Sequence, residues 1–224
     1  MFDPRANLIG QLFGALGSSD QKWFLCFGTL LKLCRGQGFL FDEDIDIGVI
    51  GFSGNVIQSL QHTAGFVPTS YILDDDTKEY LKVTYRWQNP LSRSQSDNIL
   101  SEIDFYFWKK AGQIYYHYYD EQARRPQNGI PEEYHFKGIP ASCFEPTKEE
   151  VDRFSKDRKY REYLTKHGTW QSTVPGYETT GVKVCKPYRY GTCLDFWYPD
   201  WNGERPGVSK TDYDVTVKSC KDLK

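Results

Sequence analysis

The 224-residue sequence lacks both a long hydrophobic run and a strong excess of charge of either sign. No apolar stretch approaches the roughly 20 residues that a membrane-spanning helix needs, and the first residues lack the basic start and apolar core of a secretion signal. We therefore expect a cytoplasmic protein. Because the formal net charge is only −2, general attraction to nucleic acid is not expected, and any phosphate site must be local.

The sequence also lacks the cysteine and histidine spacings that are typical of zinc sites. Its six cysteines form no Cys-x-x-Cys pair, and its four histidines show no mutual ligand spacing, so zinc is not expected. Six cysteines could form three disulfides in a secreted protein, but in a cytoplasmic chain we expect mostly free thiols. No internal repeat or low-complexity tract is present, and the length fits one domain with elaborations.

Hydrophobic periodicity in the first 51 residues predicts a helix, a strand, a second helix and a second strand. Residues 7–17 have apolar side chains at helical spacing. A short strand over 23–28 precedes a helix over 29–35, which Thr29 can cap. Residues 39–51 alternate between apolar and polar side chains, which indicates a strand with one apolar face and with Asp42, Asp44 and Asp46 on the other.

The middle of the chain is rich in predicted strands, and its second half ends in less regular sequence. A helix over 54–65 is expected to cover the sheet, and strands are predicted over 70–75, 79–87, 101–110 and 113–120. Thr147 and Glu150 have capping-box spacing at the start of a helical stretch that continues over 158–168. Spaced prolines, glycines and aromatic residues in the last fifty residues predict irregular structure and short strands.

The acidic run is the sequence's main chemical feature. Four of the five residues from 42 to 46 are acidic. On a strand, Asp44 and Asp46 project in the same direction with Cα atoms about 6.6 Å apart, close enough to converge on one divalent cation. Without a cation the carboxylates would repel each other and destabilise the fold, so this arrangement favours Mg²⁺ or Mn²⁺ as the compensating charge.

Two further features support a phosphate-handling site. Gly28 and Thr29 form a turn at a predicted helix N-terminus, where backbone N–H groups and a hydroxyl suit a phosphate. Asp104, flanked by Ile103 and Phe105 in another predicted strand, brings one more carboxylate to the same site if the strands are neighbours. The combination is typical of the nucleotidyltransferase fold, a mixed α/β (α+β) sheet flanked by helices on which metal-bound phosphates undergo in-line displacement.

The stretch FGTLLKLCRGQGFLFDEDIDIGV, residues 27–49, resembles the signature of the LicD/fukutin family. The positions that match the signature are Gly28, Thr29, Leu30, Leu31, Arg35, Gly38, Phe39, Asp42, Asp44, Asp46 and Gly48. Residues 160–170, YREYLTKHGTW, resemble the family's second landmark and keep its Gly168 and Trp170. The chain departs from the family at Lys32, Leu40, Phe41, His167 and Thr169, which leaves the carboxylates intact but affects the expected substrate specificity.

The resemblance covers about residues 5–175 and implies transfer of a phospho-alcohol, such as phosphocholine or ribitol phosphate, from a CDP-linked donor to a glycan or glycolipid hydroxyl. We therefore predict a catalytic domain over 1–175 and an irregular extension over 176–224 that packs on the same domain. No nucleic acid and no transmembrane segment are implied. Association with the inner face of a membrane, through the acceptor, is compatible with this activity.

Each site residue has a role in this interpretation. Asp44 and Asp46 hold Mg²⁺ or Mn²⁺ against the diphosphate, and Asp104 completes the metal site or accepts the acceptor's proton. The substrate-binding residues are Gly28, Thr29, Arg35 and Asp42, of which Arg35 pairs with a phosphate.

Other interpretations of the same residues stay open. The same triad would support a nucleotidyltransferase, and an Asp-x-Asp pair also binds metal in glycosyltransferases, although the preceding Gly-Thr helix argues against the latter. A binding module without turnover would keep the scaffold. An acidic run can also be a solvated face, Arg35 can complement a helix end, and Asp42 can shape the start of the strand. Lys82 and Arg86 are left outside the site because surface cations are common.

Overall fold

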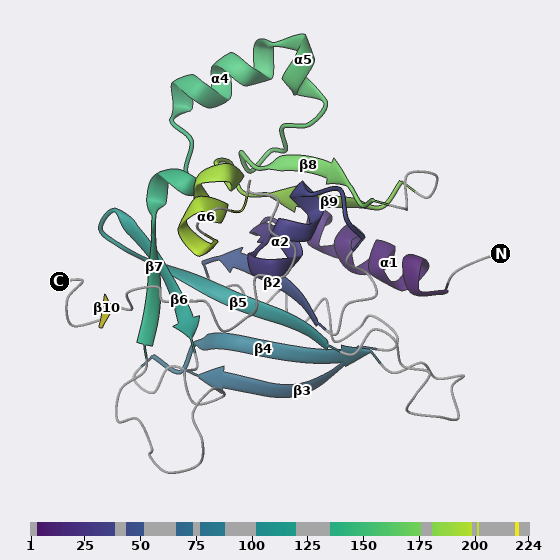
Figure 1. Ribbon diagram of the computed structural model, residues 1–224, viewed down its shortest axis with the longest axis vertical. Coiled ribbons are helices and arrows are strands. Elements are labelled where there is room, and N and C mark those ends of the chain that lie inside the picture. Colours follow the sequence, from purple (N-terminus) through teal and green to yellow (C-terminus); the bar gives the residue numbers. More distant parts are fainter. Residues whose placement is uncertain are drawn as a thin grey trace.

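The computed structural model has an α+β fold built on one mixed sheet, which confirms the predicted fold class (Figure 1). The structure describes residues 4–38, 44–51, 66–73, 77–87, 102–119, 135–175, 181–198, 201 and 218–219. The helix predicted over 54–65 lies outside the described residues.

The described helices and strands follow one another in the order that Figure 1 labels. The helices are α1 (Pro4–Ser18), α2 (Phe27–Cys34), the short 3₁₀ helix η3 (Ala141–Cys143), α4 (Lys148–Lys156), α5 (Arg158–Arg161) and α6 (Tyr190–Trp197). The strands are β1 (Lys22–Leu25), β2 (Asp44–Ile50), β3 (Phe66–Leu73), β4 (Tyr80–Trp87), β5 (Glu102–Ala111), β6 (Ile114–Tyr119), β7 (His135–Pro140), β8 (Trp170–Thr173), β9 (Lys183–Lys186) and β10 (Lys218–Ser219).

The long strand β5 is the centre of the sheet. The order along the sheet is β1-β2-β5-β6-β7-β10, and β4, which also pairs with β5, carries β3 at the edge. The pairing of β2 with β5 is parallel, whereas the other described pairings are antiparallel. Strands β8 and β9 form a separate hairpin. Figure 1 shows α1, α2, α6 and this hairpin at the β2 end of the sheet, and β3 at the opposite end.

The two faces of β2 differ as the alternating sequence predicts. Ile45, Ile47 and Val49 are completely buried, and across the parallel pairing they meet apolar residues of β5. The same face continues onto β1, where Trp23 stacks on Phe13 of α1 with ring centroids 5.4 Å apart. This buried face anchors β2, so the side chains of the alternate positions are fixed on the other face.

Several local predictions are confirmed and others need correction. The capping box of Thr147 and Glu150 is present at the start of α4. The prediction that Thr29 caps the second helix is wrong, because α2 begins at Phe27 and its N-cap is Cys26. The helix predicted over 158–168 is only the four-residue α5. The segment after residue 175 contains short strands and also α6, whose apolar residues pack into the core.

Two negative findings apply to the described residues. None of the helices that the structure describes is both long and apolar enough to cross a membrane. The described cysteines, which exclude Cys220, are free thiols, as expected.

Gly48 permits the tightest packing next to the polar face of β2. A methyl group at this position would lie 2.4 Å from Cε2 of Phe24 and 2.9 Å from Nε1 of Trp108. Both of these rings are completely buried in the hydrophobic core, so neither can move aside freely. The glycine of the Asp-x-Asp-Ile-Gly strand therefore has a packing role, whatever its role in function.

We expect Gly48→Ala to lower the free energy of unfolding by about 1–3 kcal/mol, because the added methyl group overpacks a core that cannot relax. Urea denaturation of the purified protein measures this change. Gly14→Ala is the control: Gly14 is exposed on α1 with no atom within 4 Å of the added methyl group, so it should be neutral or stabilise by up to about 1 kcal/mol. A Gly48→Ala protein as stable as the control would contradict this account.

Candidate metal centre

The parallel pairing of β2 and β5 brings together the three aspartates that the sequence analysis singled out. Asp46 lies directly opposite Asp104, and Asp44 lies opposite Glu102. One carboxylate oxygen each from Asp44, Asp46 and Asp104 lies within 4.8 Å of the others. Asp46 is 9% exposed and Asp104 is 6% exposed, so two of the three charges are almost removed from water.

The donor set fits a hard divalent cation. It offers carboxylate oxygens and no thiolate or imidazole, and oxygen ligands of this kind are preferred by Mg²⁺ and Mn²⁺ over zinc. Clustered carboxylates in a poorly solvated position repel one another, so a divalent cation would stabilise the cluster as well as bind to it.

Asp104 is held by residues of β4 and β5. Its Oδ1 accepts a hydrogen bond of 2.6 Å from the Thr84 hydroxyl, and Nζ of Lys82 lies 2.8 Å from its Oδ2. The Tyr106 hydroxyl also donates to Oδ2, at 3.4 Å. The orientation of the Asp104 carboxylate is therefore fixed, and one ammonium group already offsets part of the negative charge.

Sequence reasoning missed Lys82, Thr84 and Tyr106. The antiparallel register of β4 and β5 places Thr84 opposite Asp104 and Lys82 opposite Tyr106, so all of them share one face of the sheet. A signal was present, because polar Lys82 and Thr84 alternate with the buried side chains of β4. The alternation could not show that β4 is the neighbour of β5.

The electrostatic effect of the cluster is seen in two neighbouring side chains. Burial, followed by the charges of Asp46 and Asp104, raises the pKa of Tyr106 well above its usual value. Burial and the same two carboxylates also raise the pKa of the Cys26 thiol. Tyr106 therefore keeps its proton at neutral pH and acts as a hydrogen-bond donor to Asp104.

Thr29 connects α2 to strand β2. The side chain is 2% exposed, and its Oγ1 accepts a hydrogen bond of 3.0 Å from the backbone N–H of Asp46. The backbone N–H of Cys26 donates to the carbonyl of Asp46 at 3.1 Å. The residues just before and within the first turn of α2 thus hold both backbone groups of Asp46, a positioning role that the sequence analysis did not predict for Thr29.

Phe27, the first residue of α2, has an unusual backbone conformation. Its φ angle is 47°, in the left-handed region that is unfavourable for a bulky residue. The Phe27 ring lies 5.2 Å from Tyr106, 4.9 Å from His117 and 4.8 Å from Trp197, measured between ring centroids. These aromatic contacts hold the sharp β1–α2 turn that places Gly28 and Thr29 beside β2, and one of them comes from α6.

Of the other predicted substrate-binding residues that the structure describes, Gly28 lies beside β2 and Arg35 lies farther along α2. Arg35 follows α2 as its C-cap, six residues and therefore about 9 Å along the helix from Thr29. Its guanidinium Nη2 donates to the carbonyl of Trp201 at 2.9 Å, an interaction of the kind expected of a cation that complements backbone carbonyls. Gly28 lies in the first turn of α2, next to Thr29. Asp42 lies outside the described residues.

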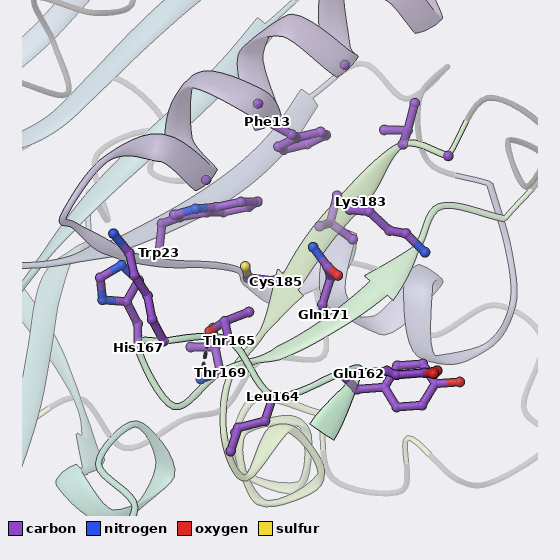
Figure 2. Close-up of a pocket in the computed structure, with 18 residues that line it drawn as sticks. Phe13, Trp23, Glu162, Leu164, Thr165, His167, Thr169, Gln171, Lys183 and Cys185 are labelled. Atoms are coloured by element: carbon purple, nitrogen blue, oxygen red, sulfur yellow. Dashed lines mark hydrogen bonds between the residues drawn. The ribbon is translucent and has the colours of Figure 1, made fainter. Parts of the chain in front are cut away.

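Two clefts are lined by described residues that include none of the three aspartates. The first has a volume of about 620 Å³ and lies between α1 and the β8–β9 hairpin. Figure 2 shows Phe13 and Trp23 on its α1 side, with Gln171, Cys185 and Lys183 on the hairpin side. The metal centre is therefore separate from this concave surface.

No protein-family model matches the chain, and no curated protein is significantly similar to it. The resemblance to the LicD/fukutin family therefore rests on the motifs quoted above and stays a prediction.

We expect Thr29→Val to destabilise the protein by about 1–3 kcal/mol, because it leaves the buried N–H of Asp46 without its acceptor. Thr29→Ser is the matched control: it keeps the hydroxyl and removes one methyl group, at a cost of about 0.8 kcal/mol. Urea denaturation of both variants separates the two effects. Equal stability of the valine and serine variants would show that this hydrogen bond does not hold β2.

Proposed function

We propose that the protein is a metal-dependent phosphotransferase of the nucleotidyltransferase fold and of the LicD/fukutin type. In this proposal it moves a phospho-alcohol from a CDP-linked donor to a hydroxyl of a glycan or glycolipid. The observation that carries the proposal is the convergence of Asp44, Asp46 and Asp104 on the pairing of β2 with β5. The strand, sharp turn and helix formed by β1 and α2 lie directly beside this pairing and support the fold assignment.

The three aspartates would have two kinds of role, metal binding and proton transfer. Asp44 and Asp46 would hold Mg²⁺ or Mn²⁺, which when bound neutralises a diphosphate and stabilises the departing nucleotide. Asp104 would complete the ligand set or accept the proton of the attacking hydroxyl. Lys82, Thr84 and Tyr106 keep its carboxylate in one orientation, as either role requires.

The proposed reaction is an in-line displacement at phosphorus. The acceptor hydroxyl attacks the phosphorus that bears the alcohol, a new P–O bond forms, and the bond to the bridging oxygen of the diphosphate breaks. CMP leaves with the bridging oxygen, and the hydroxyl proton passes to a carboxylate. In a nucleotidyltransferase, the acceptor would instead attack the phosphorus next to the nucleoside of a nucleoside triphosphate, and pyrophosphate would leave. The released product therefore distinguishes the two reactions.

Calorimetric titration of CDP, with and without Mn²⁺, tests the donor site. We expect binding that requires the metal and that disappears in the Asp44→Asn/Asp46→Asn double variant, because the ligand oxygens of the cation are lost. Asp152→Asn, which removes an exposed carboxylate of α4 outside the cluster, should bind like the wild type. Metal-indifferent binding, or none, would argue against the proposal. If CDP binds, screening CDP-alcohols for CMP release tests turnover.

Lys82→Met tests whether the ammonium substitutes in part for the metal. The methionine keeps much of the apolar stem but removes the charge 2.8 Å from Asp104, so carboxylate repulsion should rise. We expect a lower melting temperature in EDTA and a larger increase on addition of Mn²⁺ than in the wild type, measured by differential scanning fluorimetry. Lys148→Met, on exposed α4, is the control. An unchanged response to Mn²⁺ would mean that Lys82 does not contribute to the charge balance of the cluster.

A further inference from the structure

The second cleft has an aromatic lining that the proposed metal chemistry does not use. It has a volume of about 620 Å³ and lies on the face of the β8–β9 hairpin toward α4 and α5. The aromatic residues that line it are Phe154, Tyr160, Tyr163, Trp170 and Tyr190, and each is partly or largely exposed. A concentration of exposed aromatic side chains in one cleft is typical of a binding surface.

The aromatic lining is rigid. Nε1 of Trp170 donates to the carbonyl of Tyr188 at 2.8 Å, and the two rings stack with centroids 5.7 Å apart. Phe154 and Trp170 pack edge to face with ring centroids 5.3 Å apart, and Tyr160 packs beside both. A ligand ring that packs here would meet side chains already held in place, which lowers the entropic cost of binding.

The turn just before Trp170 requires a glycine at position 168. Gly168 has a φ angle of 70°, and a methyl group there would lie 2.9 Å from Cγ of Pro146. The glycine therefore allows the chain to turn sharply against the start of α4 and deliver Trp170 to the cleft. The second motif of the sequence thus shapes the cleft rather than the metal centre.

Two lysines of β9 supply positive charge to the same cleft. Lys186 is half-buried, with its Nζ 4.3 Å from the centroid of the Tyr190 ring. Nζ of Lys183 donates to the Thr173 hydroxyl at 2.7 Å. Within the part of the chain that the structure describes, neither ammonium forms a salt bridge with a carboxylate. Glu162 also lines the cleft but is exposed at its rim.

Among the described residues, no carboxylate forms a salt bridge with the half-buried ammonium of Lys186. Burial lowers its pKa below the usual value for lysine, and the nearby Cys34 opposes this shift only in part. An anionic group in the cleft would favour the charged form of Lys186, and lysine binds phosphate groups as a compact point charge.

We propose that this cleft binds a phosphorylated ring compound, with its phosphate at Lys186 and Lys183 and its ring against Trp170, Tyr160 and Tyr190. The ring is either the sugar of a sugar phosphate or the base of a nucleotide, because both have an apolar face that packs on aromatic side chains. Glu162 at the rim is placed to accept hydrogen bonds from ring hydroxyls. The proposal does not depend on the metal centre, since none of the three aspartates lines this cleft.

Calorimetry in EDTA with inorganic phosphate, glucose 6-phosphate and CMP tests this site. We expect glucose 6-phosphate or CMP to bind at least about tenfold more tightly than inorganic phosphate, since stacking on an aromatic ring contributes this much. The tighter of the two identifies the ring as sugar or base. Failure of both to bind, or binding no tighter than phosphate, would overturn the proposal.

Variants locate the site and separate it from the metal centre. Lys186→Gln should weaken binding about tenfold or more, because it removes a charged hydrogen-bond partner, whereas Lys186→Arg should keep most of the affinity. Lys148→Gln, which removes an exposed charge on α4, should have no effect. The Asp44→Asn/Asp46→Asn protein should bind like the wild type even if it no longer binds CDP with Mn²⁺. Loss of binding in that protein, or an unaffected Lys186→Gln, would overturn the proposal.

Discussion

The parallel register between β2 and β5 is the constraint on which the candidate metal centre depends. It places Asp46 opposite Asp104, and the strand period places Asp44 on the same face. A shift of the register by one residue would turn one set of side chains to the other face and separate the carboxylates. The completely buried residues Ile45 and Ile47 prevent this, because such a shift would expose them. The apolar face of β2 therefore determines the geometry of its acidic face.

The remaining structure around the cluster holds this pairing from both sides. On one side, Thr29 and the backbone of Cys26 bond both polar backbone groups of Asp46. On the other, Lys82 and Thr84 of β4 bind the carboxylate of Asp104. The cluster is thus supported by two segments that are far apart in the chain, residues 26–29 and 82–84, which explains how the like charges are kept close together.

The sequence predicted which residues share a face, but not which strands are neighbours. Alternation along 39–51 correctly placed Asp44 and Asp46 together, and the flanking apolar residues of Asp104 correctly indicated a strand. Lys82 was left out because surface cations are common, and periodicity on one strand contains no information about the neighbouring strand that sets its charge environment. Arg35 shows the same limit: its position at the end of the helix was predicted, but its contact with the carbonyl of Trp201 depends on a residue 166 positions later. The N-terminus of α2 was misplaced because the φ angle of Phe27 is unfavourable locally and is held by tertiary aromatic contacts.

The charge balance of the cluster also argues for a divalent cation rather than a solvated acidic face. An acidic face that is only solvated has exposed carboxylates, whereas Asp46 and Asp104 are 9% and 6% exposed. The Lys82 ammonium offsets part of the charge of Asp104, and one Mg²⁺ or Mn²⁺ ion would add two positive charges to the same cluster. A diphosphate brought to the same place would add further negative charge and would be repelled without the cation. In the proposed function, a cation that neutralises the aspartates would also allow the same face to accept a phosphate, so the same electrostatics would couple metal binding to substrate binding.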